Sequence, residues 1–111
     1  MVRVGSISEG KVEVEGKIYF SDLELYWDGR IKLIEKFYVV TPSDVLRLAK
    51  AGAEIIVIIS VFGNVKIEES AMEIAKSKGI DVFIEDAKKG AKLFNAFVAD
   101  NKRVVALIHT L

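Results

Sequence analysis

The sequence predicts a three-layer α/β fold, in which helices flank a mainly parallel or mixed central sheet and an N-terminal β-hairpin layer is added. Three observations lead to this prediction. The apolar run from Glu54 to Ser60 is typical of a strand covered on both faces. After it, strand patterns alternate with helical ones, which favours right-handed crossovers between parallel strands. Before it, residues of alternating polarity indicate hairpins.

Length and composition set the broad class of the protein. The chain has 111 residues, of which 51% are hydrophobic, enough to fill one core, so we expect a single domain over residues 1–111. Lys+Arg and Asp+Glu are 16 each, and the formal net charge is zero. No overall field therefore favours nucleic acid or an anionic membrane, and we expect neither as a partner.

Cysteine is absent and His109 is the only histidine. Thiolate zinc sites and His-rich metal sites are thereby excluded, and we predict no metal and no cofactor. The start of the chain lacks a signal-peptide pattern, and the apolar run Ile55–Ile59 is far shorter than a membrane span, so we expect a cytoplasmic protein. Abundant Ile, Val, Lys and Glu without Gln or Cys is typical of hyperthermophiles, and we hypothesise a thermophilic archaeon as the source.

Two hairpins are predicted before residue 35. Residues 11–15 and 18–20 alternate in polarity around a short turn, and residues 23–27 and 31–34 do the same. The dipeptide Asp28-Gly29 indicates a tight turn in the second hairpin, because glycine tolerates positive φ. Each hairpin should direct one face toward the core.

The first helix has a clear start signal. Thr41 is expected to cap it, Pro42 suits the first helical position, and Asp44 completes a box-like cap. Gly52 should end the helix. The buried strand Glu54–Ser60 follows.

Two further helices and two strands are predicted after the loop Val61–Asn64. The second helix carries an apolar stripe and ends at Gly79, before the strand Ile80–Ile84. Asp86 caps the third helix, and the last strand runs from Arg103 to His109. The predicted stripes are Ile67, Ala71, Ile74 and Ala75 in the second helix, and Ala87, Gly90, Ala91, Phe94, Phe97 and Val98 in the third.

The C-terminal half resembles a known family. The segments Ala91–Asn95 and Asp100–His109 are similar to the closing part of the adipogenesis-associated Mth-domain family, and the order of the preceding elements agrees. Where that family carries a Gly-Thr-Gly-like loop, this chain has Ser60-Val61-Phe62-Gly63. The resemblance implies a three-layer α/β domain and, where a role is known, assembly or regulation without defined catalysis; the family includes a mitochondrial respiratory complex I assembly factor.

A candidate ligand site follows from the predicted topology. Ligands of open α/β sheets bind beyond the carboxyl ends of the strands, where Ser60, Gly63, Asn64 and Asp86 are expected. Asn95, at the margin of the third helix's apolar stripe, is the fifth candidate. Each has a structural alternative: Asp86 as a helix cap, Asn95 as an anchor for backbone groups, and the loop residues as ordinary turn formers.

No constellation of residues predicts catalysis. His109 has no evident Ser, Asp or Cys partner in the sequence and is expected to be a packed or a surface residue. Lysines 88, 89 and 92, with Lys102 and Arg103, are expected on a solvated face that fits an acidic protein partner. Most of an aromatic cluster in the N-terminal third is expected in the core, and the members that point outward favour protein contact; the cluster comprises Tyr19, Phe20, Tyr26, Trp27, Phe37 and Tyr38.

The predicted function is therefore that of an uncharacterised, non-catalytic domain acting through protein–protein contacts in assembly or regulation, with a protein partner or as a homo-oligomer. The alternative is a small-molecule-binding protein or enzyme that uses the Ser60–Asn64 loop with Asp86 and Asn95.

Overall fold

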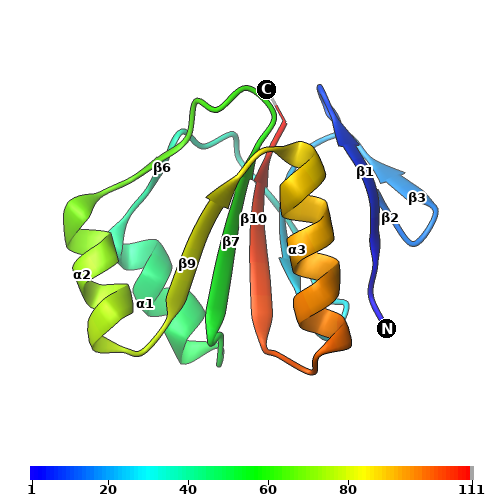
Figure 1. Cartoon of the computed structure of the whole chain (residues 1–111). Helices are drawn as coiled ribbons and strands as arrows, with labels where there is room; N and C mark the ends of the chain where they lie inside the picture. The colour runs from blue at the N-terminus through cyan, green and yellow to red at the C-terminus, as the bar shows by residue number, and fades with distance from the viewer. Residues whose placement is uncertain (111) are drawn as a thin grey trace.

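A five-stranded mixed sheet forms the centre of the molecule in the computed structural model, which describes residues 1–110 (Figure 1). Its strand order is β5-β4-β10-β7-β9. β10 and β9 run parallel to β7, whereas β4 is antiparallel to β10 and β5 is antiparallel to β4. The predicted three-layer α/β class is confirmed, with a sheet of the mixed kind. The strands are β4 (Asp22–Tyr26), β5 (Ile31–Ile34), β7 (Ile55–Ser60), β9 (Asp81–Glu85) and β10 (Val104–His109).

The two central strands explain the apolar run seen in the sequence. Every residue of β7 and of β10 is buried, because both faces of the sheet are covered. The two strands pair in register over their whole length, from Val104 beside Ile55 to His109 beside Ser60. Since β7, β9 and β10 are parallel, they all end at one edge, which we call the carboxyl end of the sheet.

One face of the sheet packs against α3 (Ala87–Ala99) and a separate three-stranded sheet (Figure 1). That small sheet contains β1 (Val4–Ser8), β2 (Lys11–Val14) and β3 (Lys17–Tyr19). Asp86 caps α3 as predicted, since its Oδ1 accepts the Lys89 N–H at 2.8 Å. Gly90 lets the helix approach the sheet closely, because a Cβ there would lie 2.6 Å from Cγ1 of Ile59.

The other face packs against α1 (Pro42–Lys50) and α2 (Glu69–Ser77). The predicted capping box of α1 is present: Asp44 N–H donates to Thr41 Oγ1, and the Asp44 carboxylate accepts the Thr41 N–H at 2.8 Å. The α2 prediction was wrong at its start. Ile67 lies in β8 (Lys66–Ile67), which pairs in parallel with β6 (Val39–Val40).

The first predicted hairpin, β2 and β3, belongs to the small sheet on one face, whereas β4 and β5 join the edge of the main sheet beside β10. One prediction for the N-terminal third needs correction. Alternation in β4 predicted one solvated face, yet all five of its residues are buried. The polar residues Asp22 and Glu24 therefore lie inside the molecule.

Candidate functional site

Three of the five predicted ligand-site residues meet at the carboxyl end of the sheet. Ser60, Gly63 and Asp86 line one shallow depression of about 270 Å³, which Val61, Ile84, Glu85 and Lys89 complete. They come from the ends of β7 and β9 and from the first turn of α3, as the parallel topology requires. The depression brings a carboxylate pair and one lysine side chain together.

Ser60 and Asn64 interact with each other. The Ser60 hydroxyl donates to Asn64 Oδ1 at 2.9 Å, and the Asn64 N–H donates to Ser60 Oγ at 3.1 Å. Ser60 is buried and Asn64 is exposed. These bonds close the turn after β7, and Gly63 adopts a positive φ of 68° within it.

Asn95 lies elsewhere, on the side of α3 that contacts β1. Its Oδ1 accepts the Val4 N–H and its Nδ2 donates to the Val4 carbonyl, each at 2.8 Å. The side chain thus satisfies both backbone groups of one strand residue, which corresponds to the structural alternative for Asn95.

Sequence reasoning missed a cluster of buried polar side chains on β4 and β10, on the face of the sheet that α1 and α2 cover. Asp22, Glu24 and Tyr26 alternate along β4, and His109 lies near Asp22 at the end of β10. In the sequence, the polar residues of β4 alternate with apolar ones, and this pattern predicted that they face solvent. Their burial becomes evident only from the pairing of β4 with β10.

His109 does have an acidic partner, contrary to the expectation from the sequence. Its Nδ1–H donates to Asp22 Oδ2 at 2.7 Å, and that carboxylate also accepts the backbone N–H groups of Phe37 and Thr110 at 3.2 and 3.1 Å. The imidazole is fully buried, and the rings of Phe37 and Tyr38 lie against it edge-on. Within the described chain its Nε2 has no hydrogen-bond partner.

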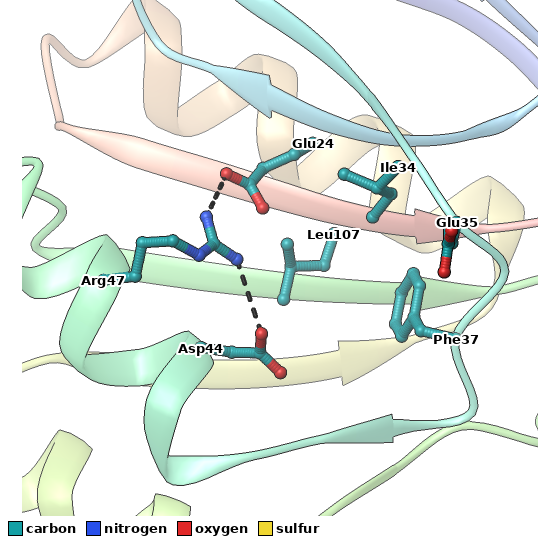
Figure 2. Close-up of a pocket in the computed structure, with 7 residues that line it drawn as sticks. All are labelled: Glu24, Ile34, Glu35, Phe37, Asp44, Arg47 and Leu107. Carbon is teal, nitrogen blue, oxygen red and sulfur yellow. Dashed lines mark hydrogen bonds and ion pairs between the residues drawn. The ribbon is translucent and has the colours of Figure 1, made fainter.

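Glu24 forms a second buried cluster with Tyr26 and Arg47 (Figure 2). Glu24 Oε1 accepts from the Tyr26 hydroxyl and from Arg47 Nη1, each at 2.5 Å. Burial and the Glu24 carboxylate raise the pKa of Tyr26 to about 12, and the same carboxylate raises the pKa of Arg47. This cluster borders a cavity of about 150 Å³, lined by Glu24, Ile34, Glu35, Phe37, Asp44, Arg47 and Leu107.

Exposed apolar side chains gather at the carboxyl end of the sheet. Phe20 precedes β4, whose first residues pair with the end of β10, and Phe62 follows β7. The Tyr38 ring contacts His109, the last residue of β10. Six of the ten exposed large hydrophobic residues in the described chain lie at or beside strand ends, from β5 at one edge of the main sheet to β9 at the other and in the β6–β8 ladder, and together we call them the carboxyl-end surface: Phe20, Leu33, Tyr38, Val39, Phe62 and Ile84.

The aromatic cluster lies mainly in the core, as predicted, whereas the basic surface is smaller than the sequence suggested. Of the six clustered aromatic residues only Phe20 and Tyr38 are exposed. Lys88 and Lys89 lie in the first turn of α3, whereas Lys102 follows its other end. A helix of 13 residues separates the two groups by about 20 Å, so they do not form one patch.

Two features are absent from residues 1–110. No group of three or more His, Cys, Asp or Glu side chains in this range has an arrangement that could hold a metal ion. Within the same range, no helix is long and apolar enough to cross a membrane.

No family model matches the sequence, but solved structures share its fold. The conserved hypothetical protein PH1505 from Pyrococcus horikoshii OT3 is 17% identical, over 97% of this chain and 98% of that one, with a TM-score of 0.81. A structure named MT938 is 19% identical, over 99% and 98%, with a TM-score of 0.78. A Mth938-like domain protein from Bordetella pertussis is 15% identical, over 98% and 85%, with a TM-score of 0.67.

At these identities the likeness establishes the fold alone. It supports the resemblance to Mth-domain proteins at that level, since Mth938-like domain proteins are among the structural neighbours of this chain.

Proposed function

We propose that this chain is a non-catalytic domain that acts through protein–protein contacts, with the carboxyl-end surface as its contact surface. An assembly or regulatory role is the one that the Mth-domain resemblance implies. The observation that carries the proposal is the concentration of exposed apolar side chains at one end of the sheet.

The composition of this surface fits a protein partner. Phe20 is 75% exposed, and large aromatic side chains are enriched where proteins meet. The charged residues around the surface carry both signs, which gives no field toward an anionic membrane or nucleic acid. They are Glu35, Lys36, Lys66, Glu85 and Lys89.

Site-specific cross-linking in cells of the source organism tests the proposal. A photoreactive amino acid replaces Phe62, and a control chain carries it at the exposed Met72 of α2. We expect one protein, either another chain or a second copy of this one, to be cross-linked from position 62 and not from position 72.

A pair of matched variants completes the test. Phe20→Ser with Phe62→Ser should abolish the cross-linked complex, whereas Leu46→Ser with Met72→Ser, which removes two exposed apolar residues elsewhere, should keep it. Equal loss in both variants, or no product from position 62, contradicts the proposal.

The second candidate is small-molecule binding in the depression at Ser60, Gly63 and Asp86. Its support is the convergence of these predicted residues beside Lys89. A thermal-shift screen of metabolites tests it: a ligand should stabilise the wild type and Lys88→Met, and should lose its effect on Lys89→Met. Since Lys88 is an exposed neighbour on the same turn and does not line the depression, equal shifts in both variants contradict this candidate.

A further inference from the structure

A groove between α3 and β1 gathers positive charge. Its volume is about 380 Å³, and its lining includes Arg3, just before β1, and Lys88 and Lys92 of α3. All three residues are exposed, and the ion pairs of residues 1–110 involve none of them. The groove therefore offers three cationic groups that the described chain does not neutralise.

The rest of the lining does not oppose these charges. Among residues 1–110 no carboxylate lines the groove, and Ile7, Ala87 and Ala91 form its apolar part. Glu13 packs over Gly5, and Asp86 caps the first turn of α3, but neither side chain belongs to the lining. The charge of the groove is thus complementary to an anionic partner.

The spacing of the cationic groups fits an extended chain. Figure 1 shows β1 beside α3 and running in the opposite direction, with Asn95 bonded to Val4 beyond Lys92. Lys88 and Lys92 are about 6 Å apart along the helix axis, since each residue rises about 1.5 Å. Alternate residues of an extended peptide lie about 6.6 Å apart and point to the same side. Acidic residues at alternate positions can therefore face both lysines and, further along, Arg3.

The edge of β1 favours a peptide over a small anion. The small sheet has the order β1-β2-β3, so within the described chain only one side of β1 pairs with a strand. The other side faces the groove, where Asn95 satisfies the N–H and the carbonyl of Val4. An extended peptide offers main-chain donors and acceptors to the remainder of such an edge, whereas inorganic phosphate cannot extend a sheet.

We propose that the groove between α3 and β1 binds an extended acidic segment of a partner protein, with acidic residues at three alternate positions that face Lys88, Lys92 and Arg3. The groove shares no residue with the carboxyl-end surface. The proposal rests on the protein-contact function in naming a second surface for a partner, but its test uses a peptide alone, so the two can fail separately.

Backbone amide NMR of the full chain, titrated at constant ionic strength with the acetylated and amidated peptide Glu-Thr-Glu-Thr-Glu, tests the proposal. We expect saturable shifts at Ser6, Ile7 and Lys92. Gln-Thr-Gln-Thr-Gln has the same length without charge and should bind at least about tenfold more weakly, because three exposed ion pairs are lost. Thr-Glu-Glu-Glu-Thr keeps the charge but places at most two carboxylates on one side, so it should bind about threefold more weakly.

A pair of charge variants tests the role of the lysines. Lys88→Met with Lys92→Met should weaken binding of Glu-Thr-Glu-Thr-Glu about tenfold, because two of the three ion pairs are lost. Lys76→Met with Lys78→Met makes the same change in net charge at exposed positions near the end of α2 and should bind nearly like the wild type.

A second pair of variants tests the groove itself. Ser6 is exposed and lines the groove, so Ser6→Trp should fill it and abolish binding while all three cationic groups remain. Ser8→Trp, at an exposed position of β1 outside the lining, is the matched control and should bind like the wild type. Phe20→Ser with Phe62→Ser should also bind the peptide like the wild type, which separates this groove from the carboxyl-end surface.

The proposal is overturned if Glu-Thr-Glu-Thr-Glu gives no saturable shifts in the groove, or if binding persists in Ser6→Trp. Equal affinity for Thr-Glu-Glu-Glu-Thr also overturns it, because net charge alone would then explain the binding. Inorganic phosphate that shifts the same residues with equal affinity would indicate a general anion site, and a pentathymidine oligonucleotide that binds more tightly would indicate a nucleic-acid surface. Either result contradicts the proposal.

Discussion

The two faces of the central sheet are built from alternate residues of the same strands, yet they differ in character. The face toward α3 and the small sheet has an apolar core, with Leu23 and Leu25 of β4 and Ala106 and Ile108 of β10 in it. The face toward α1 and α2 contains a second apolar core, but Asp22, Glu24 and His109 interrupt it near one edge.

The two faces therefore contribute differently: one mainly stabilises the fold, and the other also holds polar groups. A close-packed apolar core gains the full benefit of burial. The other face carries buried polar groups that must find donors and acceptors, and it contains the cavity beside Glu24. Four predictions, from the largest expected effect to the smallest, test the contrast.

Truncating a side chain on the face toward α3 and the small sheet should lower the free energy of unfolding the most. Phe94 of α3 is fully buried in its core, and Phe94→Ala should lower the free energy of unfolding by about 4 kcal/mol through lost burial and the cavity left behind. Urea unfolding measures this change. Leu46→Ala, at an exposed position of α1, should cost less than about 0.5 kcal/mol. A cost for Phe94→Ala below about 1 kcal/mol would mean that this face is loosely packed.

On the face toward α1 and α2, Asp22→Ala should lower the free energy of unfolding by about 3 kcal/mol. The change leaves His109 Nδ1 and the N–H groups of Phe37 and Thr110 without their acceptor inside the protein. Asp28→Ala breaks only an exposed pair with Arg30 and should cost at most about 1 kcal/mol. Thermal and urea unfolding compare the two; equal costs would show that Asp22 is not an organising residue.

Asn95→Ala should destabilise the attachment of the small sheet by about 2 kcal/mol, because both hydrogen bonds to Val4 are lost. Hydrogen exchange at the Val4 amide should speed up, whereas Lys92→Ala on the exposed side of the same helix should leave it unchanged. Unchanged exchange in Asn95→Ala would return Asn95 to the set of candidate ligand-binding residues.

The smallest effect concerns Tyr26 and pH. Its folded-state pKa of about 12 lies above the ordinary value of 10.0, so the folded state retains the proton more tightly than the unfolded state does. The resulting stabilisation is complete below pH 10 and is lost as the pH rises through about 12. We expect a loss of about 1 kcal/mol over this window relative to Tyr26→Phe, measured by urea unfolding of both proteins. Parallel pH profiles would contradict the interaction with Glu24.

Local signals in the sequence predicted the elements best. The Thr41-Pro42-Asp44 cap and the Asp86 cap depend on residues within one helical turn, and both are present. The buried strand Ile55–Ser60 was equally visible, because covering both faces requires continuous apolar character. β6 and β8 were missed, since strands of two residues carry no periodicity.

The contacts that the sequence did not predict depend on pairing between elements that are far apart in the chain. Ser60, Gly63 and Asp86 could be expected at one edge because parallel strands end together, and the structure does bring them to one depression. Asn95 does not join them, because its place on α3 turns it toward β1. The Asp22–His109 contact joins residues 87 positions apart and depends on the antiparallel pairing of β4 with β10. No local pattern encodes that pairing.

The short β6–β8 ladder joins the chain segments that precede the N-termini of α1 and α2. Val39 and Val40 lie directly before α1, and their partners Lys66 and Ile67 lie just before α2. The two helices therefore share one anchor although 18 residues of chain separate Lys50 from Glu69. A displacement of α1, the helix that contributes Asp44 and Arg47, would strain the hydrogen bonds between β6 and β8. Movements of α1 and α2 should therefore be coupled.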